Sequence, residues 1–541
     1  MCQSCEIKKR RKGKIIMKKR LTAFLLVICM FAAVFTACGS NQEENTAATG
    51  SSSAASADSQ KAKGNEEGDN VLKTAASFAY PSLDVHKEYY GWYTSIYGLS
   101  EALFKFDESA TAVDCLAEDA EADGTKWTIT LKDGVTFSNG DPLTADVVIQ
   151  NIQRLAEVNE RFSYLGDFTW TAEDDLTITV DTGADVYPML KNDLASPEAG
   201  MIDLDATKDF DKDPVCTGPF VITEFNPEGD VTVARNENYW GGDVKLDGAV
   251  FYYMQEDDPK LLAMQSGEID CYNSVSSGAL EVYEKEPDKY HVESVAGTRL
   301  QYYILNENRL DDSVRAAINL TVDKEAIAEY LKGTVSAATS PYPASTAYSN
   351  ITIPAVDAEQ AKKLLEDDGY TLGQDGIYEK DGNKLKLNIC YYAARSLDTL
   401  AVLIQEQLKA IGIDSYLTVE EDPDSTYIAT ADFDLALYCM ISDKCGDPQY
   451  FIDSTLADGA YYNVGGFKND ECQAMIEQLR VEVDPDKRAE LANQIIQIAV
   501  DDNAFGYVGL FNHTTVMKPG VSGFAEKIPF DFYGVDANTV K

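Results

Sequence analysis

The chain has 541 residues, of which 90 are acidic and 46 are lysine or arginine, and its formal net charge at pH 7 is −44. A surface this negative repels phosphate backbones, so nucleic acid is excluded as an expected partner. Because 45% of the residues are apolar and the chain is longer than one hydrophobic core usually serves, we expect a folded protein with at least two lobes.

The N-terminal segment has the pattern of an export signal. Basic residues at 18–20 precede a largely apolar run at 21–35. At about 1.5 Å per residue, this run is too short for a hydrocarbon core of about 30 Å, which favours a signal peptide over a membrane helix. We expect translation to start at Met17 and residues 1–37 to be removed.

Residues 35–39, Phe-Thr-Ala-Cys-Gly, resemble the lipobox of bacterial lipoproteins, in which the cysteine carries the lipid and becomes the mature N-terminus. This resemblance implies a lipid on Cys38 and a position on the outer face of the cytoplasmic membrane. Residues 39–70 contain no aromatic residue and no Leu, Ile or Val, so they cannot build a core. We therefore expect residues 38–70 to form a flexible tether with a reach of about 30 Å.

From residue 71 onward, strand and helix patterns alternate along the chain, which is typical of the α/β class with mixed sheets. Residues 127–131 alternate apolar and polar side chains and predict a strand, with turns at Gly134 and Gly140 after it. A helix is expected from the N-cap Thr144, because apolar residues then recur at every third or fourth position.

Three later segments also have helical patterns. The first begins at Asp357 and ends at Gly369, the second covers 396–411 and precedes a strand at 413–419, and the third begins at Asp484. Each has apolar residues on one face, which we expect to be buried. These residues are Ala361, Leu364, Leu365, Leu400, Ile404, Leu408, Ile411, Leu491, Ile495 and Ile498.

The sequence lacks the local signatures of common enzyme sites. It has no G-x-S-x-G elbow, no H-E-x-x-H pair, no phosphate loop and no dinucleotide fingerprint, and its three histidines lie far apart. A binding protein is therefore favoured over an enzyme. The seven cysteines after Cys38 show no zinc-ligand spacing, so we expect buried thiols. Only Cys439 and Cys445 are close enough in sequence to suggest a disulfide.

A series of motif strings resembles the peptide and nickel solute-binding family of ABC importers, over about residues 71–541. The strings follow the family's order and lie at 127–142, 217–220, 235–241, 266–270, 314–318, 361–365 with 369–370, and 446–448. Most of their residues are expected to be scaffold. The aromatic residues that we expect in the core are Trp127, Phe137, Tyr239 and Trp240.

The resemblance implies a two-lobed fold of the periplasmic-binding-protein type, in its large type II form, with a ligand cleft and a hinge of crossing strands. We expect lobe I to comprise 71–300 with 511–541, and lobe II to comprise 301–510. The implied role is a monomeric, non-catalytic receptor without a cofactor of its own. It would deliver a small ligand to the permease and ATPase subunits of an ABC importer.

Within the family, the chain is most similar to the nickel-chelate branch. Residues 159–165 resemble the stretch in which nickel-type receptors place an arginine that grips chelate carboxylates, and Arg161 takes that position. The alternative for Arg161 is an ordinary surface arginine at a helix end. This chain has Ser442 and Gly446 where nickel-type receptors carry two aromatic residues. The histidine that coordinates the metal in that branch would align near Ala460 of this chain. We therefore expect that no side chain of the protein coordinates a metal directly. The expected solute is a chelate that brings its own metal-coordinating groups, with nickel as the favoured metal.

Other interpretations stay open. A dipeptide or oligopeptide is the second candidate ligand, because peptide-binding relatives place an aspartate four residues before the proline of Asp-Pro. Lys444 stands there in this chain and cannot hold an ammonium group, but Asp443 next to it could do so if the loop shifts, so both are candidate ligand contacts. A surface chaperone or a signalling receptor on the same fold is a further alternative.

Four aromatic residues lie where the family lines its cleft, and they are expected either to stack on ligand or to pack in the core. They are Tyr89, Tyr90, Trp92 and Tyr93.

Overall fold

The computed structural model describes residues 70–525 and 527–541. The expected signal peptide 1–37, the lipid site Cys38 and the tether as far as residue 69 lie outside the described residues. No helix within the described ranges is both long and apolar enough to cross a bilayer.

A mixed sheet of 11 strands runs through the described chain in the order β18-β17-β19-β12-β20-β11-β1-β10-β9-β8, with β13 paired to β20. The expected α/β class with mixed sheets is thereby confirmed. The strands of this sheet are β1 (Val71–Ala76), β8 (Phe220–Phe225), β9 (Val231–Arg235), β10 (Gly248–Tyr253), β11 (Cys271–Asn273), β12 (His291–Leu305), β13 (Val335–Ala337), β17 (Lys386–Tyr392), β18 (Asp414–Glu420), β19 (Leu435–Ile441) and β20 (Phe505–Met517).

We call the elements before β12, together with the segment after β20, lobe I, and the elements between β12 and β20 lobe II. Lobe I also holds a two-stranded sheet, β2-β3, and a four-stranded sheet, β4-β5-β7-β6. The bounds of these strands are β2 (Phe104–Phe106), β3 (Ala112–Asp114), β4 (Ala117–Asp123), β5 (Lys126–Leu131), β6 (Thr169–Ala172) and β7 (Thr177–Asp181). The helices of lobe I are α2 (Tyr90–Ile96), α3 (Ala145–Val158), η2 (Glu160–Asp167), α4 (Leu190–Asp193), η3 (Pro197–Ala199), α5 (Asp257–Ser266) and α6 (Ser277–Glu284).

Lobe II adds a small sheet of three short strands, β14 (Thr371–Leu372), β15 (Tyr378–Lys380) and β16 (Asn383–Lys384). Its helices are α7 (Asp312–Asn319), α8 (Lys324–Tyr330), η4 (Ala347–Ser349), α9 (Ala358–Asp367), α10 (Leu397–Ala410), α11 (Tyr427–Thr430), α12 (Gln449–Thr455), α13 (Asp470–Leu479) and α14 (Pro485–Asp501).

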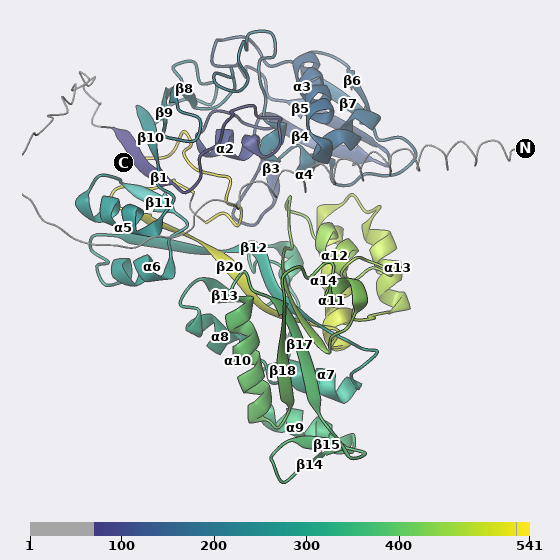
Figure 1. Ribbon diagram of the computed structural model, residues 1–541. Helices are drawn as coiled ribbons and strands as arrows, with labels where there is room; N and C mark the ends of the chain where they lie inside the picture. The colour runs from purple at the N-terminus through teal and green to yellow at the C-terminus, as the bar shows by residue number, and fades with distance from the viewer. Residues whose placement is uncertain (1–69, 526) are drawn as a thin grey trace, which may run out of the picture. The chain divides into compact units, whose positions relative to one another are not determined.

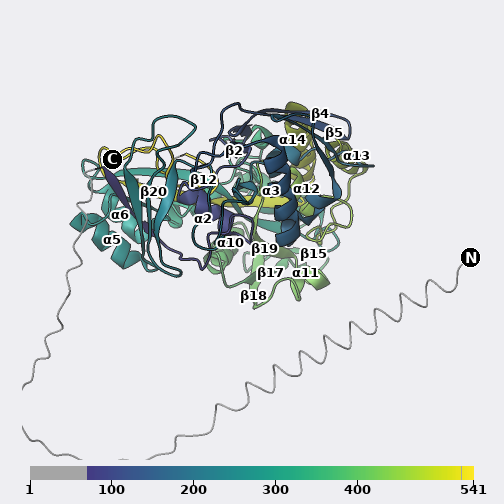
Figure 2. The ribbon, with the colours of Figure 1, turned by 90° about the horizontal axis from the view of Figure 1, so that it is seen from above.

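The long strands β12 and β20 cross from one lobe to the other. They pair antiparallel, and their register shifts between Ala296 and Leu300. On one side β20 pairs with β11 of lobe I, and on the other β12 pairs with β19 of lobe II. Figures 1 and 2 show α5 and α6 beside one end of these strands and β17 and β18 beside the other. The expected lobe boundaries, at 300 and 510, fall at this irregular part of the ladder, where a strand bends most easily.

One edge of the lobe II sheet faces lobe I. Strand β17 pairs in parallel with β18 and β19, so the carboxyl ends of all three strands lie at the same edge. Strand β12 runs antiparallel to β19 and places Arg299 opposite Ile441, the last residue of β19. Because β12 enters lobe II from lobe I at this point, the carboxyl ends of β17, β18 and β19 lie at the edge of the lobe II sheet that is next to lobe I.

The expected helices form where their caps and apolar faces indicate. Thr144 is the N-cap residue of α3, although its side chain makes no capping hydrogen bond. The carboxylates of Asp357 and Asp484 accept backbone N–H groups at the starts of α9 and α14. Most of the apolar-face residues are buried, and Leu364 and Ile498 are the half-buried exceptions.

Two expectations about individual residues are corrected. Trp127 and Phe137 lie in the core, but Tyr239 and Trp240 are only half-buried, and their ring groups donate hydrogen bonds to the carboxylate of Glu101 at 2.8 Å each. The suggested disulfide between Cys439 and Cys445 is absent, because both are free thiols. Cys439 lies in β19, whereas Cys445 lies in the loop that turns toward lobe I.

Candidate functional site

Arg161 lies in η2 of lobe I, and its guanidinium is held by an acid and an aromatic ring. Nη1 donates to Oε1 of Glu198 at 2.7 Å, and the guanidinium carbon stands 4.2 Å from the centroid of the Tyr89 ring. Glu198 has no exposed side-chain surface, and its other oxygen accepts the hydroxyl of Ser196. The Arg161 side chain is 40% exposed, and among the described residues its Nε and Nη2 have no hydrogen-bond partner. This arrangement presents a fixed and partly free guanidinium to an incoming anion.

The aromatic residues next to Arg161 form one contact group. Tyr89 is half-exposed and meets Trp92 edge to face at 5.5 Å between centroids. Trp92 in turn packs against Phe532 of the C-terminal segment at 5.5 Å. The structure thus places two of the four expected aromatic residues beside Arg161.

The other two aromatic residues belong to a separate group. The ring of Tyr93 stacks on that of Tyr80 at 3.5 Å, and the two hydroxyls are hydrogen-bonded. Tyr90 meets Tyr80 edge to face at 6.3 Å. Burial is the main reason that the pKa of Tyr93 is raised far above its ordinary value. Both residues therefore pack mainly against Tyr80.

Asp443 lies in the loop that follows β19, and its carboxylate shapes that loop. Oδ1 accepts the backbone N–H groups of Cys445, Gly446 and Asp447 at 3.0, 2.6 and 3.2 Å. Oδ2 accepts the hydroxyl of Tyr348 at 2.5 Å, and the residue has no exposed surface. Burial raises the pKa of Asp443 to about 6. The structure does not present Asp443 for the predicted direct contact with a ligand, because every polar contact of its carboxylate is with the protein itself.

Lys444, in contrast, is exposed. Its Nζ stands 3.6 Å from the centroid of the Tyr450 ring, a close cation–π contact. Within the described ranges it forms no ion pair with a carboxylate. An ammonium at this position repels the amino terminus of a peptide, which weighs against the peptide interpretation.

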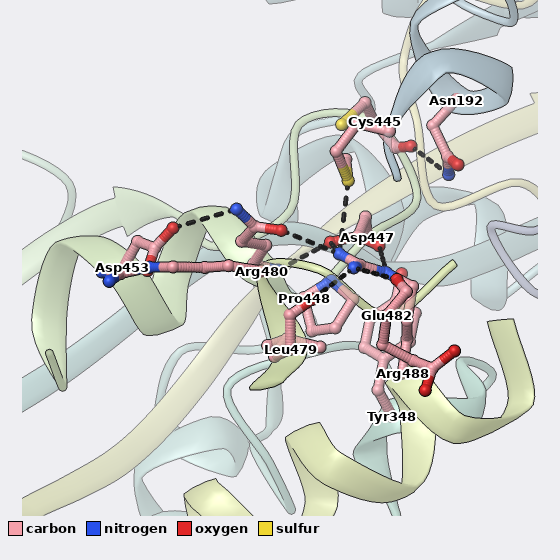
Figure 3. Close-up of polar contacts among 12 residues, drawn as sticks. Asn192, Tyr348, Cys445, Asp447, Pro448, Asp453, Leu479, Arg480, Glu482 and Arg488 are labelled. Atoms are coloured by element: carbon pink, nitrogen blue, oxygen red, sulfur yellow. Dashed lines mark hydrogen bonds and ion pairs between the residues drawn. The ribbon is translucent and has the colours of Figure 1, made fainter. Parts of the chain in front are cut away.

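A buried ion pair anchors the same loop from below (Figure 3). The guanidinium of Arg488 in α14 donates from Nε and Nη2 to the two carboxylate oxygens of Asp447, at 2.7 Å each. Nη1 donates to the carbonyls of Leu479 and Glu482, at 2.6 and 2.9 Å. The two side chains are 5% and 7% exposed. Arg488 thus fixes the loop 443–447 to the helical side of lobe II.

The loop 443–447 also touches lobe I. The side-chain amide of Asn192 donates to the carbonyls of Cys445 and Gly446 at 2.9 and 3.0 Å (Figure 3 shows Asn192 beside Cys445). Gly446 has a φ of +69°, and a Cβ there would come within 2.1 Å of the Ala110 carbonyl oxygen. Only glycine permits this approach of the two backbones. The same Cβ would press on the ring of Phe106, which packs against Phe532 and so joins the loop to the aromatic group beside Arg161.

The carboxyl of Asp193, next to Asn192 in the sequence, makes the stability of the folded protein depend on pH. Burial raises the pKa of its carboxyl from 3.8 to about 7, although the hydroxyls of Tyr187 and Tyr164 donate to Oδ2 at 2.7 and 2.8 Å. A carboxyl whose pKa is raised in the folded state contributes stability that is complete below the unfolded-state pKa. That contribution is lost as pH rises through the folded-state pKa.

We expect Asp193→Asn to remove this pH dependence, because an amide oxygen still accepts the two tyrosine hydroxyls but does not titrate. Between about pH 4 and about pH 7, the free energy of unfolding should fall more steeply for the parent chain than for the variant. Urea unfolding at a series of pH values measures both slopes. Asp174→Asn is the control, because hydrogen bonds lower the pKa of that exposed carboxyl, so its titration lies below this range. Parallel curves for the parent chain and Asp193→Asn would show that burial does not perturb this group.

Two arginines at the edge of lobe II were not singled out by the sequence. Arg299 lies on β12 opposite the end of β19, and Arg395 follows the end of β17. The available signal was the position of Arg395 directly before the expected helix 396–411, since loops after parallel strands commonly bind ligands. No comparable signal marks Arg299, because only pairing with β19 brings it to this edge.

The arrangement can hold an anion without transforming it. It supplies guanidinium groups, aromatic rings and a loop shared by two lobes. Within residues 70–525 and 527–541, no three His, Cys, Asp or Glu side chains gather as a metal site. A ligand held here would be gripped by charge and aromatic contact.

The chain is similar to known proteins in sequence and in fold. A family model described as bacterial extracellular solute-binding proteins, family 5 Middle, matches residues 111–463. The nickel-binding protein NikA of Staphylococcus aureus is 25% identical over 446 residues, which are 82% of this chain and 89% of that protein. The oligopeptide-binding protein AppA of Bacillus subtilis is 23% identical over 572 residues, with 96% of this chain and 99% of that protein covered. A crystal structure of a nickel ABC transporter protein from Bacillus halodurans, 24% identical, superposes with a TM-score of 0.82 over 87% of this chain and all of that one.

Proposed function

The chain belongs to the bacterial extracellular solute-binding proteins of family 5, and from that premise we propose that it captures a small carboxylate-bearing solute, with a nickel or other metal chelate favoured. Proteins of this family are the substrate-binding subunits of ABC importers and not enzymes. They work outside the cytoplasm with permease and ATPase subunits. The ligand, the lipid anchor on Cys38 and the metal are the parts that we propose.

The carboxylate preference is supported by one observation, the free edge of the Arg161 guanidinium. Glu198 occupies Nη1 and the Tyr89 ring covers one face, so Nε and Nη2 are the donors left for a ligand. A guanidinium held in this way presents two parallel N–H groups, which match the two oxygens of a carboxylate.

A metal in the ligand is supported by the relatives. The similar proteins include nickel-binding ones, and the described residues offer no cluster of three metal-ligating side chains. A metal held at Arg161 would therefore arrive with its own ligands, as a chelate whose carboxylates contact the protein. Peptides are the second candidate, because peptide-binding proteins are also among the relatives.

A thermal-shift screen tests the ligand class. A form of the chain that begins at Gly39 would be mixed with nickel–histidine complex, metallophore complexes and short peptides. A ligand at 100 times its Kd stabilises the folded state by about 2.7 kcal/mol, which raises the melting temperature measurably. We expect a rise with nickel–histidine or a metallophore complex. A rise with peptides alone would reverse the order of the two candidates.

A further inference from the structure

Arg299 and Arg395 differ from every other arginine in the described chain. Residues 70–525 and 527–541 contain nine arginines, and seven of them form ion pairs with Asp or Glu. Arg299 and Arg395 form none with any acidic residue of these ranges. The seven paired arginines are Arg154, Arg161, Arg235, Arg309, Arg315, Arg480 and Arg488.

The two unpaired arginines lie close together. The side-chain amide of Gln301, two residues after Arg299 on β12, donates to the carbonyl of Arg395 at 2.6 Å. Both guanidiniums also act on the same two neighbours, because each opposes the rise in pKa that burial causes for Cys439 and Tyr392. Both arginines therefore lie near Cys439 and Tyr392, at the edge of lobe II that faces lobe I.

The backbone at Arg395 is held in an unusual conformation. Arg395 and Ser396 have φ values of +54° and +56°, in the left-handed region that non-glycine residues rarely adopt. This conformation is strained for residues other than glycine, and strained residues cluster where ligands bind. We infer that packing with the rest of the fold, and not local backbone preference alone, holds the loop at Arg395 in this conformation.

The surroundings of the two arginines suit an organic anion. Tyr392 packs against Tyr438 at 5.7 Å between ring centroids, and Tyr438 packs against Tyr462 at 4.9 Å. Three acids border this region: Asp424 accepts the hydroxyl of Tyr438 at 3.1 Å, Glu420 stands opposite Tyr392 in the sheet, and Asp531 opposes Arg299 in its effect on the pKa of His513; among the described residues none of them forms an ion pair with Arg299 or Arg395. Ligand sites commonly combine aromatic walls with a few charged groups. Two nearby guanidiniums without a paired carboxylate repel each other, and a bound anion would relieve that repulsion.

We propose that Arg299 and Arg395 form a second carboxylate site, on lobe II, and that the ligand carries at least two anionic groups, one for this pair and one for Arg161 on lobe I. The inference rests on the proposed capture of a carboxylate-bearing solute, and it narrows the ligand class to multiply charged ones. It also explains how a ligand favours closure, because a molecule that bridges guanidiniums on both lobes binds the closed form better than either lobe alone.

The test compares Arg299→Gln, Arg395→Gln and the double variant with the parent chain, by calorimetry with the nickel–histidine complex. We expect each single change to weaken binding about tenfold and the double change about a hundredfold. Arg480→Gln is the matched control, because that lobe II arginine is paired with Asp453 and Glu477, and its Kd should stay within about twofold of the parent value. Nickel–histamine, which lacks carboxylates, should bind the parent chain and the double variant equally weakly.

The outcomes separate this inference from the proposed function. If nickel–histidine binds and Arg161→Ala weakens it while the double variant does not, the second site is wrong and the proposed function stands. If only trialanine binds, the ligand carries a single carboxylate, and the inference of two anionic groups is overturned. If nickel–histidine, trialanine and citrate all fail to bind the parent chain, the inference falls with the proposed function.

Discussion

Asp447→Ala is expected to lower the free energy of unfolding by about 3 to 5 kcal/mol, because it leaves the Arg488 guanidinium buried without its counter-charge. The pair is bidentate, and both side chains are almost fully buried. Two carbonyls still accept from Nη1, but they do not neutralise the charge. Urea unfolding followed by tyrosine and tryptophan fluorescence measures the loss.

The matched control for Asp447 lies a few residues away. Asp453 pairs with Arg480 at 2.9 Å, but these side chains are 31% and 36% exposed, so solvent screens their attraction. Asp453→Ala should cost less than about 1 kcal/mol. The double variant Asp447→Leu with Arg488→Met should recover most of the stability, since a buried pair replaced by apolar groups of similar size is often neutral. Equal losses for Asp447→Ala and Asp453→Ala would mean that the pair is not protected from water.

Arg161→Ala is expected to weaken binding of the nickel–histidine complex by about 2 to 5 kcal/mol, because a guanidinium paired with a carboxylate in a closed cleft is lost. Arg161→Lys should lie between the parent chain and the alanine variant, since lysine keeps the charge but not the planar pair of donors. Calorimetry gives the three affinities. An unchanged affinity for Arg161→Ala would retire Arg161 as a ligand contact.

The alanine change also removes the partner of a buried carboxylate, and this second effect needs its own control. Glu198 has no exposed surface, so Arg161→Ala leaves it uncompensated and should lower stability. The double variant Arg161→Ala with Glu198→Gln removes that charge. It should regain stability without regaining affinity. Recovery of affinity in the double variant would show that Arg161 acts by holding Glu198 and η3 in place.

The site explains how the lobes are coupled. Asn192 and the backbone of Gly446 connect α4 of lobe I to the loop 443–447, which Asp443 shapes and Arg488 anchors. The crossing strands β12 and β20 provide the place where the lobes can bend, at the shift in their register. A ligand that binds Arg161 on lobe I and loops of lobe II would favour the arrangement in which Asn192 contacts the loop 443–447.

Local patterns in the sequence were enough to predict the main helices and the family. The helix α10 buries Leu400, Ile404 and Leu408, and α14 begins at the cap of Asp484, as their local patterns indicate. These features depend on spacing within one helical turn and on caps within three residues, so a short window of sequence contains their cause. Family membership followed from the order of the motif strings.

The contacts between side chains far apart in the sequence could be found only from the three-dimensional fold. Asp443 looked available to a ligand, but its carboxylate is buried and accepts the hydroxyl of Tyr348, 95 positions away. Arg161 was expected, but its partner Glu198, 37 positions on, was not. Arg299 and Arg395 become neighbours through the pairing of β12 with β19 and of β19 with β17. The reason is physical: burial and ion pairing depend on distances through space, and the packing of the whole sheet sets those distances.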